Sequence, residues 1–182
     1  MNSMFYSCEQ LISVDLSNFV TPKLTDMKNM FYDCKKLVSI NLSSFDTSNV
    51  ETISCMFLNC ESLVSIDLFK TKTTKVKFIS AMFENCILLK SIDLSNLVST
   101  NNLMWMGSAF KNCTSLEYIN LFNLVTNNAR HMDFMFYNCI SLTSLNLSNF
   151  YTSRVTNIES MFDGCIKLEY INLKNVAEKK II

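Results

Sequence analysis

The sequence predicts an α/β solenoid of seven repeats of about 26 residues, with a parallel sheet on its concave face and short helices on its convex face. Three observations predict it. Cysteine returns at a fixed spacing, each repeat changes from a helical to a strand-like hydrophobic period, and the 182 residues include only two Gly and one Pro. So few turn-formers disfavour a fold of many tight hairpins. The solenoid is expected to cover residues 1–176, and residues 177–182 form a charged tail.

Cysteine marks the repeat most clearly. Seven cysteines share one position of the pattern Phe-x-x-Cys-x-x-Leu-x-x-Ile-x-Leu, at spacings of 26, 26, 26, 27, 26 and 26 residues. They are Cys8, Cys34, Cys60, Cys86, Cys113, Cys139 and Cys165. Such self-similarity is typical of a solenoid, in which each repeat buries its apolar face only against its neighbours. Residues 1–8 match residues 27–34, so the chain begins within a repeat and we expect it to be a fragment.

The first half of each repeat predicts a short helix. Within residues 24–45, apolar side chains recur at i, i+3, i+4 and i+7, and Thr25 is placed to cap the helix. The apolar residues of this stripe are Met27, Met30, Phe31 and Cys34.

The second half predicts a strand. Ile40 and Leu42 alternate with Ser39, Asn41 and Ser43, which is the period of a half-buried strand. Strands from equivalent positions of successive coils must run parallel. Because strands pack about 4.8 Å apart whereas helices are about 10 Å across, the helical side is expected to splay, which makes the sheet the concave face.

The loop after each strand carries a column of threonines. Their hydroxyl groups are expected to bond loop backbone that would otherwise stay unpaired near the core. The column contains Thr21, Thr47, Thr73, Thr100, Thr126 and Thr152.

The composition excludes several classes of partner. The 16 basic and 16 acidic residues are interspersed, so no basic patch is available for a phosphate backbone, and nucleic acid is not an expected partner. No run of about 18 apolar residues occurs, so this fragment is predicted to lack a membrane span. No motif for a cofactor is present.

The cysteines and the single histidine are the candidates for a chemical site. Zinc ligands come in pairs two to four residues apart, so a 26-residue spacing disfavours a metal. A disulfide between neighbouring coils remains open on distance, but we interpret the column as buried free thiols. His131 is expected to be exposed at a helix end, so a catalytic pair with Cys139, whose thiol faces the core, is disfavoured.

One outward strand position is always Asp or Asn. Asp67 and Asp93 are neighbours in this column, and two carboxylates at strand spacing must share a proton, recruit a cation or turn into solvent. A solvated polar ladder is the main interpretation. A weak cation site at Asp67 and Asp93 is the alternative, and a hydrolytic acid pair is the third.

Aromatic side chains interrupt the serines on either side of this column. Period-two alternation makes Tyr118, Asn120 and Phe122 point outward from one strand, and Tyr170 takes the place of Tyr118 two repeats later. Exposed aromatic residues on a rigid sheet are favoured anchors of protein interfaces, although single exposed apolar residues are also common. The predicted binding residues are Phe69, Tyr118, Asn120, Phe122, Tyr170 and Lys174.

These repeats resemble a known family. The segment 109–121, with Phe110, Cys113, Leu116 and Ile119, resembles the repeat unit of BspA-like leucine-rich-repeat surface proteins, and SVDLSNFVT at 13–21 is similar to repeats of mycoplasma surface lipoproteins. Leucine-rich repeats place Asn or Cys three residues after the last strand leucine, so we expect an apolar spine instead of an asparagine ladder. That position holds Phe19, Phe45, Thr71, Leu97, Leu124, Phe150 and Val176.

The resemblance implies a non-enzymatic recognition or adhesion module at the cell surface or outside the cell, with a host or matrix protein as its partner. The outward aromatic residues favour a protein ligand on the concave sheet. Two alternatives stay open. The first is a structural spacer or a repeat array that self-associates end to end, because open solenoid ends leave strand edges and apolar core uncovered. The second is a module that binds carbohydrate or a cation at the aspartate column.

Overall fold

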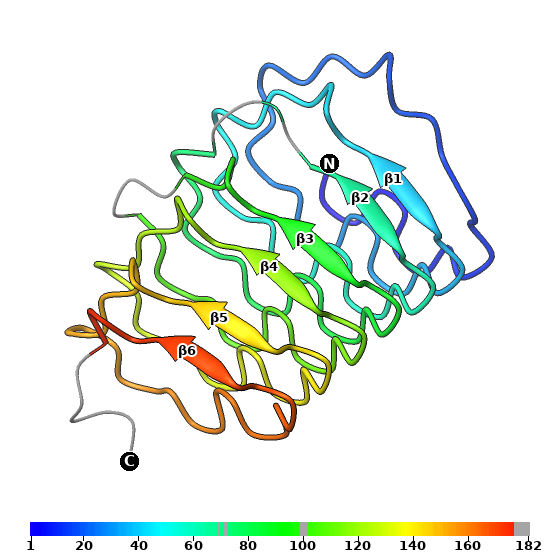
Figure 1. The fold of residues 1–182 in the computed structure, drawn as a ribbon. Coiled ribbons are helices and arrows are strands. Elements are labelled where there is room, and N and C mark those ends of the chain that lie inside the picture. The colour runs from blue at the N-terminus through cyan, green and yellow to red at the C-terminus, as the bar shows by residue number, and fades with distance from the viewer. Residues whose placement is uncertain (69, 71–72, 99–101, 177–182) are drawn as a thin grey trace.

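The chain winds into a stack of similar coils, with a row of short strands along one side (Figure 1). The computed structural model describes residues 1–68, 70, 73–98 and 102–176. The strands are β1 (Ser39–Asn41), β2 (Ser65–Asp67), β3 (Ser91–Asp93), β4 (Tyr118–Asn120), β5 (Ser144–Asn146) and β6 (Tyr170–Asn172). In each strand the central residue faces the core and the two outer side chains face solvent or the surface, as the alternating pattern predicts.

The strands pair in parallel, which confirms the predicted direction. β1 pairs with β2, β3 with β4 and β5 with β6, and each register joins equivalent repeat positions such as Ser91 and Tyr118. The predicted strand around Val14 is not assigned in the described first coil, which has a neighbouring coil on one side only. A second parallel ladder of isolated bridges runs along another side of the coils. It joins Asp26, Thr52, Phe78, Trp105, His131 and Asn157 in succession.

The predicted convex helices are wrong. No helix forms in the described residues, and the segments that carry the helical pattern are successions of turns. Alternate N–H groups of these segments donate to the next coil: Met27 N–H to Thr52 O at 3.0 Å and Phe31 N–H to Met56 O at 2.9 Å. A donor used between coils is lost to the i to i−4 bonds of a helix. The described residues accordingly contain no helix that is long and apolar enough to cross a membrane.

The absence of helices also removes the basis for predicting a concave sheet. That prediction required the opposite side to be about twice as wide as a strand ladder, but both sides carry parallel ladders. We therefore call the surface formed by β1 to β6 the strand face, without assigning a curvature to it.

The core is a set of side-chain columns that run through the coils. The phenylalanine of each Phe-x-x-Cys pattern stacks on its equivalents, with ring centroids 5.2 to 5.9 Å apart. These residues are Phe5, Phe31, Phe57, Phe83, Phe110, Phe136 and Phe162. The predicted spine after the strands also forms where it is described, since Phe45, Leu97, Leu124 and Phe150 are buried and Phe19 stacks on Phe45.

The threonine column has the predicted role. Thr21 Oγ1 accepts a hydrogen bond from Asp46 N–H at 2.9 Å, and Thr126 Oγ1 accepts one from Tyr151 N–H at 2.8 Å. Each bond ties the loop of one coil to the loop of the next, and both threonines are buried. Thr100 lies outside the described residues.

Candidate functional site

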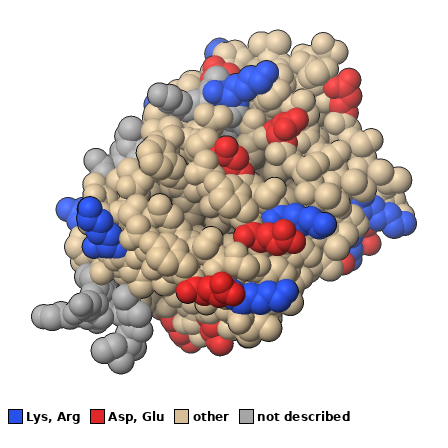
Figure 2. Space-filling model, viewed as in Figure 1, with Lys and Arg blue, Asp and Glu red and all other residues tan. Residues whose placement is uncertain are grey.

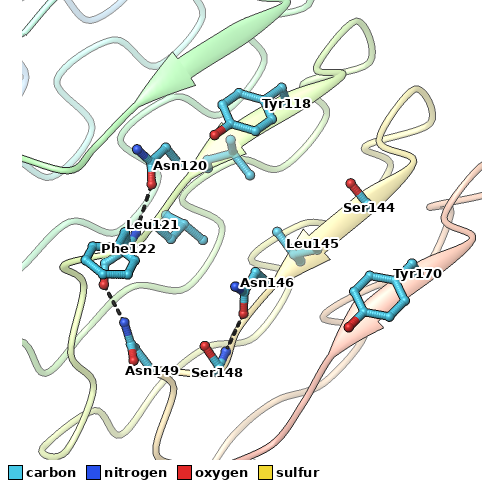
Figure 3. A pocket seen from close by; sticks show the side chains of 11 residues that line it. Tyr118, Asn120, Leu121, Phe122, Ser144, Leu145, Asn146, Ser148, Asn149 and Tyr170 are labelled. Carbon is cyan, nitrogen blue, oxygen red and sulfur yellow. Dashed lines mark hydrogen bonds between the residues drawn. The ribbon is translucent and has the colours of Figure 1, made fainter.

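The strand face carries a groove over its C-terminal half. Its volume is about 310 Å³, and β5 forms its floor between β4 and β6 (Figure 3). The residues that line it are Tyr118, Ile119, Asn120, Leu121, Phe122, Ser144, Leu145, Asn146, Ser148, Asn149 and Tyr170. Four of the six predicted binding residues thus share one surface: Tyr118, Asn120, Phe122 and Tyr170.

Large side chains on the outer strands and small ones on the middle strand create this groove. Ser144 is in register with Tyr170 on β6, and it occupies the repeat position that Tyr118 occupies on β4. The two tyrosines are thus two strand spacings apart, roughly 10 Å. Tyr118 is 59% exposed, Tyr170 62% and Phe122 71%, so each ring presents most of its surface to solvent.

None of the described residues that line the groove is charged. Figure 2, viewed from the same side, shows an uncharged area over the middle of β4 and β5, with acidic and basic groups around it. Hydroxyl and amide groups supply the polarity of the groove instead. It therefore presents neutral hydrogen-bonding groups beside exposed aromatic rings.

The Asp/Asn column stabilises the turns that follow the strands. Asn120 Oδ1 accepts a hydrogen bond from Phe122 N–H at 3.1 Å, and Asn146 Oδ1 accepts one from Ser148 N–H at 3.0 Å. This is an Asx turn, in which a side chain replaces a backbone acceptor two residues before the donor. The Nδ2 groups of both amides have no partner among the described residues, so they are available to a ligand.

Phe122 is held in place through its backbone. Its N–H is bonded to Asn120, and its carbonyl oxygen accepts a hydrogen bond from Asn149 Nδ2, as the dashed lines in Figure 3 show. The ring itself stays exposed. A backbone fixed on both sides of an exposed aromatic ring reduces the entropy lost when a partner binds.

The other predicted site residues lie elsewhere. Lys174 is exposed just after β6 but does not line the groove, and Phe69 lies outside the described residues. Asp67 and Asp93 share a separate shallow depression with Lys70. Asp93 Oδ1 accepts a hydrogen bond from Ser95 N–H at 2.7 Å, so this carboxylate already serves the turn after β3. The cation site at these two aspartates remains a prediction.

Two ladders of amide side chains were not predicted from the sequence. The first lies directly before the column cysteines of the inner coils: Asn85 Nδ2 donates to Asn59 Oδ1 at 2.6 Å, and Asn112 Nδ2 donates to Asn85 Oδ1 at 2.8 Å. All three residues have positive φ, from 59° to 63°, a conformation that Asn tolerates better than most residues. The recurrence of Asp, Asn or Gly before successive cysteines was the signal that could have revealed it.

The second ladder corrects the prediction that no asparagine ladder exists. Asn lies two residues after the last strand leucine, instead of three, and bonds the backbone of the preceding coil. Asn123 Nδ2 donates to Ser95 O at 2.7 Å, and Asn149 Nδ2 donates to Phe122 O. These bonds cross-link the turns that border the groove, so the ladder coexists with the apolar spine.

The column cysteines form a third ladder inside the core. Cys60 Sγ donates to Phe31 O at 3.1 Å, and Cys113 Sγ donates to Phe83 O at 3.0 Å. The cysteines from Cys34 to Cys139 in this column are buried free thiols, as interpreted from the sequence, whereas Cys8 is exposed. Burial raises the pKa of Cys34 to about 11 and raises the pKa of Cys86 well above the ordinary value of 9.0.

This burial predicts that stability falls in alkali. The pKa of Cys60, Cys86, Cys113 and Cys139 is raised by burial, so above pH 9.0 these thiols ionise in the unfolded chain but not in the folded one. Each thiol should then lower the free energy of unfolding with a slope that grows through pH 9.0 and approaches a limit of about 1.4 kcal/mol per pH unit well above it. The stabilisation is fully present below pH 9.0 and is lost as the pH rises towards the folded-state pKa.

Urea unfolding under reducing conditions, at several pH values between about 8 and 10, measures this slope. Cys86→Ala removes one thiol and should make the slope shallower by one thiol's share. An unchanged slope in this variant would show that the Cys86 thiol ionises equally in both states.

His131 and Cys139 do not form a catalytic pair. His131 Nδ1 lies 3.7 Å from Asp133 Oδ1, and the imidazole ring packs against Trp105 with centroids 4.9 Å apart. The Cys139 thiol donates to Phe110 O in the core. Across the part of the chain that the structure describes, no three His, Cys, Asp or Glu side chains are grouped so that they could hold a metal ion.

The chain is similar to one protein family along nearly its whole length. Residues 1–117 and residues 91–181 match the model of the family described as "Mycoplasma protein of unknown function, DUF285". This match confirms the resemblance to mycoplasma repeats. No curated protein matches the sequence.

Two solved structures align with this chain. The leucine-rich repeat protein of T. pallidum aligns with a TM-score of 0.58 and 21% identity, covering 92% of this chain and 71% of that one. A leucine-rich repeat protein from Eubacterium ventriosum aligns with a TM-score of 0.42 and 19% identity, covering 71% of this chain and 31% of that one. The first of these alignments identifies the fold as a leucine-rich-repeat solenoid.

Proposed function

The chain belongs to the DUF285 family of Mycoplasma proteins of unknown function, and we propose that it is a non-enzymatic protein-recognition or adhesion module of a cell-surface or secreted protein. The groove over β5 is the proposed binding surface. Its partner is another protein, and a host or matrix protein is the class that the family resemblance favours.

The composition of the groove carries this proposal. Among the described residues, its solvent-facing lining consists of uncharged Tyr, Phe, Ser and Asn side chains. Tyrosine offers a large, rigid and amphipathic contact at low entropic cost, and Ser and Asn supply adaptable hydrogen bonds, which is why antibody paratopes are rich in these residues. A partner that covers Tyr118, Phe122 and Tyr170 would desolvate three exposed rings at once.

The rigidity of the surface supports the same proposal. The strands β4 and β5 of the groove belong to coils whose backbones bond both neighbouring coils, and the turns after these strands are fixed by Asx bonds and the Asn123 and Asn149 ladder. A surface that is ordered before binding loses little conformational entropy in the complex.

Removal of two groove rings tests the proposal. Tyr118→Ala combined with Phe122→Ala should weaken binding to host cells or immobilised matrix proteins about thirtyfold, the equivalent of about 2 kcal/mol. Both rings are largely exposed, so circular dichroism and the melting temperature should stay near those of the unmodified chain.

Trp105→Ala provides the matched control, because Trp105 is an exposed aromatic residue on the bridge ladder and not in the groove. An equal loss of binding in the control and in the double variant would indicate that exposed aromatic rings contribute to binding non-specifically. Binding that survives the double variant would place recognition outside the groove.

A further inference from the structure

Two tyrosines of the groove lie on either side of a short side chain, on a line that crosses the strands. Tyr118 on β4 and Tyr170 on β6 flank Ser144 on β5, as Figure 3 shows. The two rings are two strand spacings apart, roughly 10 Å. Tyr118 lies on an inner coil and is 59% exposed, close to the 62% of Tyr170, so the exposure belongs to the strand position itself.

A row of amide groups runs beside this line, two residues further along each strand. Asn120 and Asn146 form it on β4 and β5. Their Oδ1 atoms accept hydrogen bonds from the following turns at 3.1 and 3.0 Å, and their Nδ2 groups have no partner among the described residues. The row therefore offers hydrogen-bond donors, and a matching ligand supplies acceptors.

Charge complementarity restricts the ligand further. None of the described lining residues is charged, whereas acidic and basic side chains surround the area (Figure 2). A charged group of a ligand that became buried here would lose its hydration without gaining an opposite charge, which is costly. The segment that the groove accommodates is therefore uncharged.

We propose that the groove binds a proline-rich segment of the partner protein, which adopts the polyproline II conformation and runs across the strands. This inference rests on the proposed function, since it names the partner chemistry of the same groove. Residues three apart in a polyproline II helix lie on one side, about 9 Å apart along the axis. That repeat matches the spacing of Tyr118 and Tyr170, so prolines at i and i+3 stack on the two rings above Ser144.

The hydrogen-bonding groups of such a segment fit the amide row. A polyproline II backbone forms no internal hydrogen bonds, so its carbonyl oxygens are free to accept from the Nδ2 groups of Asn120 and Asn146. Proline has no N–H group, so the buried segment leaves no donor unsatisfied. An α-helix uses its carbonyl groups internally, and an extended strand brings N–H groups for which this row has few acceptors. The preset backbone also loses little entropy on binding.

A fluorescently labelled oligoproline peptide of about nine residues, or three turns of polyproline II, is the probe. Its fluorescence anisotropy should rise as the unmodified protein is added. A glycine-serine peptide of equal length is neutral but flexible, and it should bind about tenfold more weakly. The inference is overturned if the two peptides bind equally, or if oligoproline does not bind at protein concentrations up to about 1 mM.

Ser144→Tyr fills the space between the two rings and should weaken oligoproline binding about tenfold. Tyrosine occupies the same exposed position on β4 and β6, so the variant should keep the melting temperature of the unmodified chain. Ser91→Tyr is the matched control and should bind normally, because Ser91 is the equivalent residue of β3 and lies outside the groove. Unchanged or tighter binding by Ser144→Tyr would show that exposed rings attract the peptide without the groove, which overturns the inference.

Asn146→Asp tests the amide row. Aspartate keeps the acceptor for the turn, as Asp93 does after β3, but it replaces the Nδ2 donor with a carboxylate oxygen. Oligoproline binding should therefore fall about tenfold. Asn41→Asp is the matched control for the added charge, since Asn41 holds the same position on β1 and makes the same bond to its own turn. An equal affinity of Asn146→Asp and the unmodified protein would contradict donation by this row.

A neutral carbohydrate distinguishes a sugar site from a peptide site. Cellohexaose should not bind the groove, and its binding there in place of oligoproline would overturn the inference in favour of a carbohydrate ligand.

The double variant Tyr118→Ala, Phe122→Ala separates this inference from the proposed function. If the double variant loses binding to host cells or matrix proteins while the unmodified protein binds no oligoproline, the proposed function stands and the proline-rich ligand is wrong. If the unmodified protein binds oligoproline through the groove while the double variant still binds host cells and matrix proteins, the ligand chemistry stands and the proposed function of the groove is wrong.

Discussion

Phe83→Ala should lower the free energy of unfolding by about 3–5 kcal/mol, as buried Phe to Ala substitutions do. Phe83 is fully buried in the middle of the phenylalanine column, with centroids 5.4 Å from Phe57 and 5.8 Å from Phe110. Truncation removes both ring contacts and leaves a cavity between two coils that are held apart by their backbone bonds. Urea unfolding followed by circular dichroism measures the loss.

The position within the stack sharpens this prediction. In a solenoid, stability is approximately a sum of contributions from each repeat and from each junction, so an inner ring supports two junctions and an end ring one. Phe5→Ala, in the first coil, should therefore cost less than Phe83→Ala. Phe122→Ala removes a ring that is largely exposed and should change stability by no more than about 0.5 kcal/mol. Equal losses at Phe83 and Phe122 would contradict the proposed core.

The sequence was sufficient to predict the columns and the strand direction. In a 26-residue repeat, equivalent residues must lie above one another, so burial of the Phe, Cys and Leu columns follows from the alignment alone. The outward position of Tyr118, Asn120 and Phe122 follows from the period of two. A prediction of the groove would require a comparison between repeats, because Ser144 occupies the position at which the neighbouring repeats have Tyr118 and Tyr170.

The prediction of convex helices was wrong for a physical reason. Apolar residues at i, i+3, i+4 and i+7, as in Met27 and Phe31, indicate which side chains face the core but do not identify the acceptors of the backbone N–H groups. In this chain the next coil supplies the acceptors, and two residues per coil turn to positive φ, such as Asn29 and Asp33. A helix tolerates neither feature.

The side chains of the Asp/Asn column show a second limit of sequence patterns. Their outward position was correctly predicted, but their carbonyl groups bond to the backbone two residues later and are not free for a ligand. Asn146 thus stabilises the turn that places Ser148 in the groove, while its Nδ2 group remains available. One residue serves both the fold and the candidate site, which a pattern of outward polar residues does not reveal.

The amide ladder before the cysteines predicts the second large effect. Asn85→Val should lower the free energy of unfolding by about 2–4 kcal/mol, through two separate causes. Asn85 has a φ of 63°, which a β-branched residue adopts only with strain. Its amide also accepts from Asn112 and donates to Asn59, so valine leaves two polar groups without their partner in a partly buried region.

Asn85→Gly separates the two causes and serves as the matched control. Glycine loses the same two hydrogen bonds but adopts positive φ without strain, so it should cost about 1–2 kcal/mol less than valine. Urea unfolding of both variants gives the difference directly. Equal losses would show that the backbone at Asn85 relaxes to negative φ, and then the bond from Asn85 N–H to Lys111 O, 2.8 Å long in the native coil, could not persist. The left-handed residue is needed because it points this N–H at the next coil, and the ladder of amides forms where that conformation recurs.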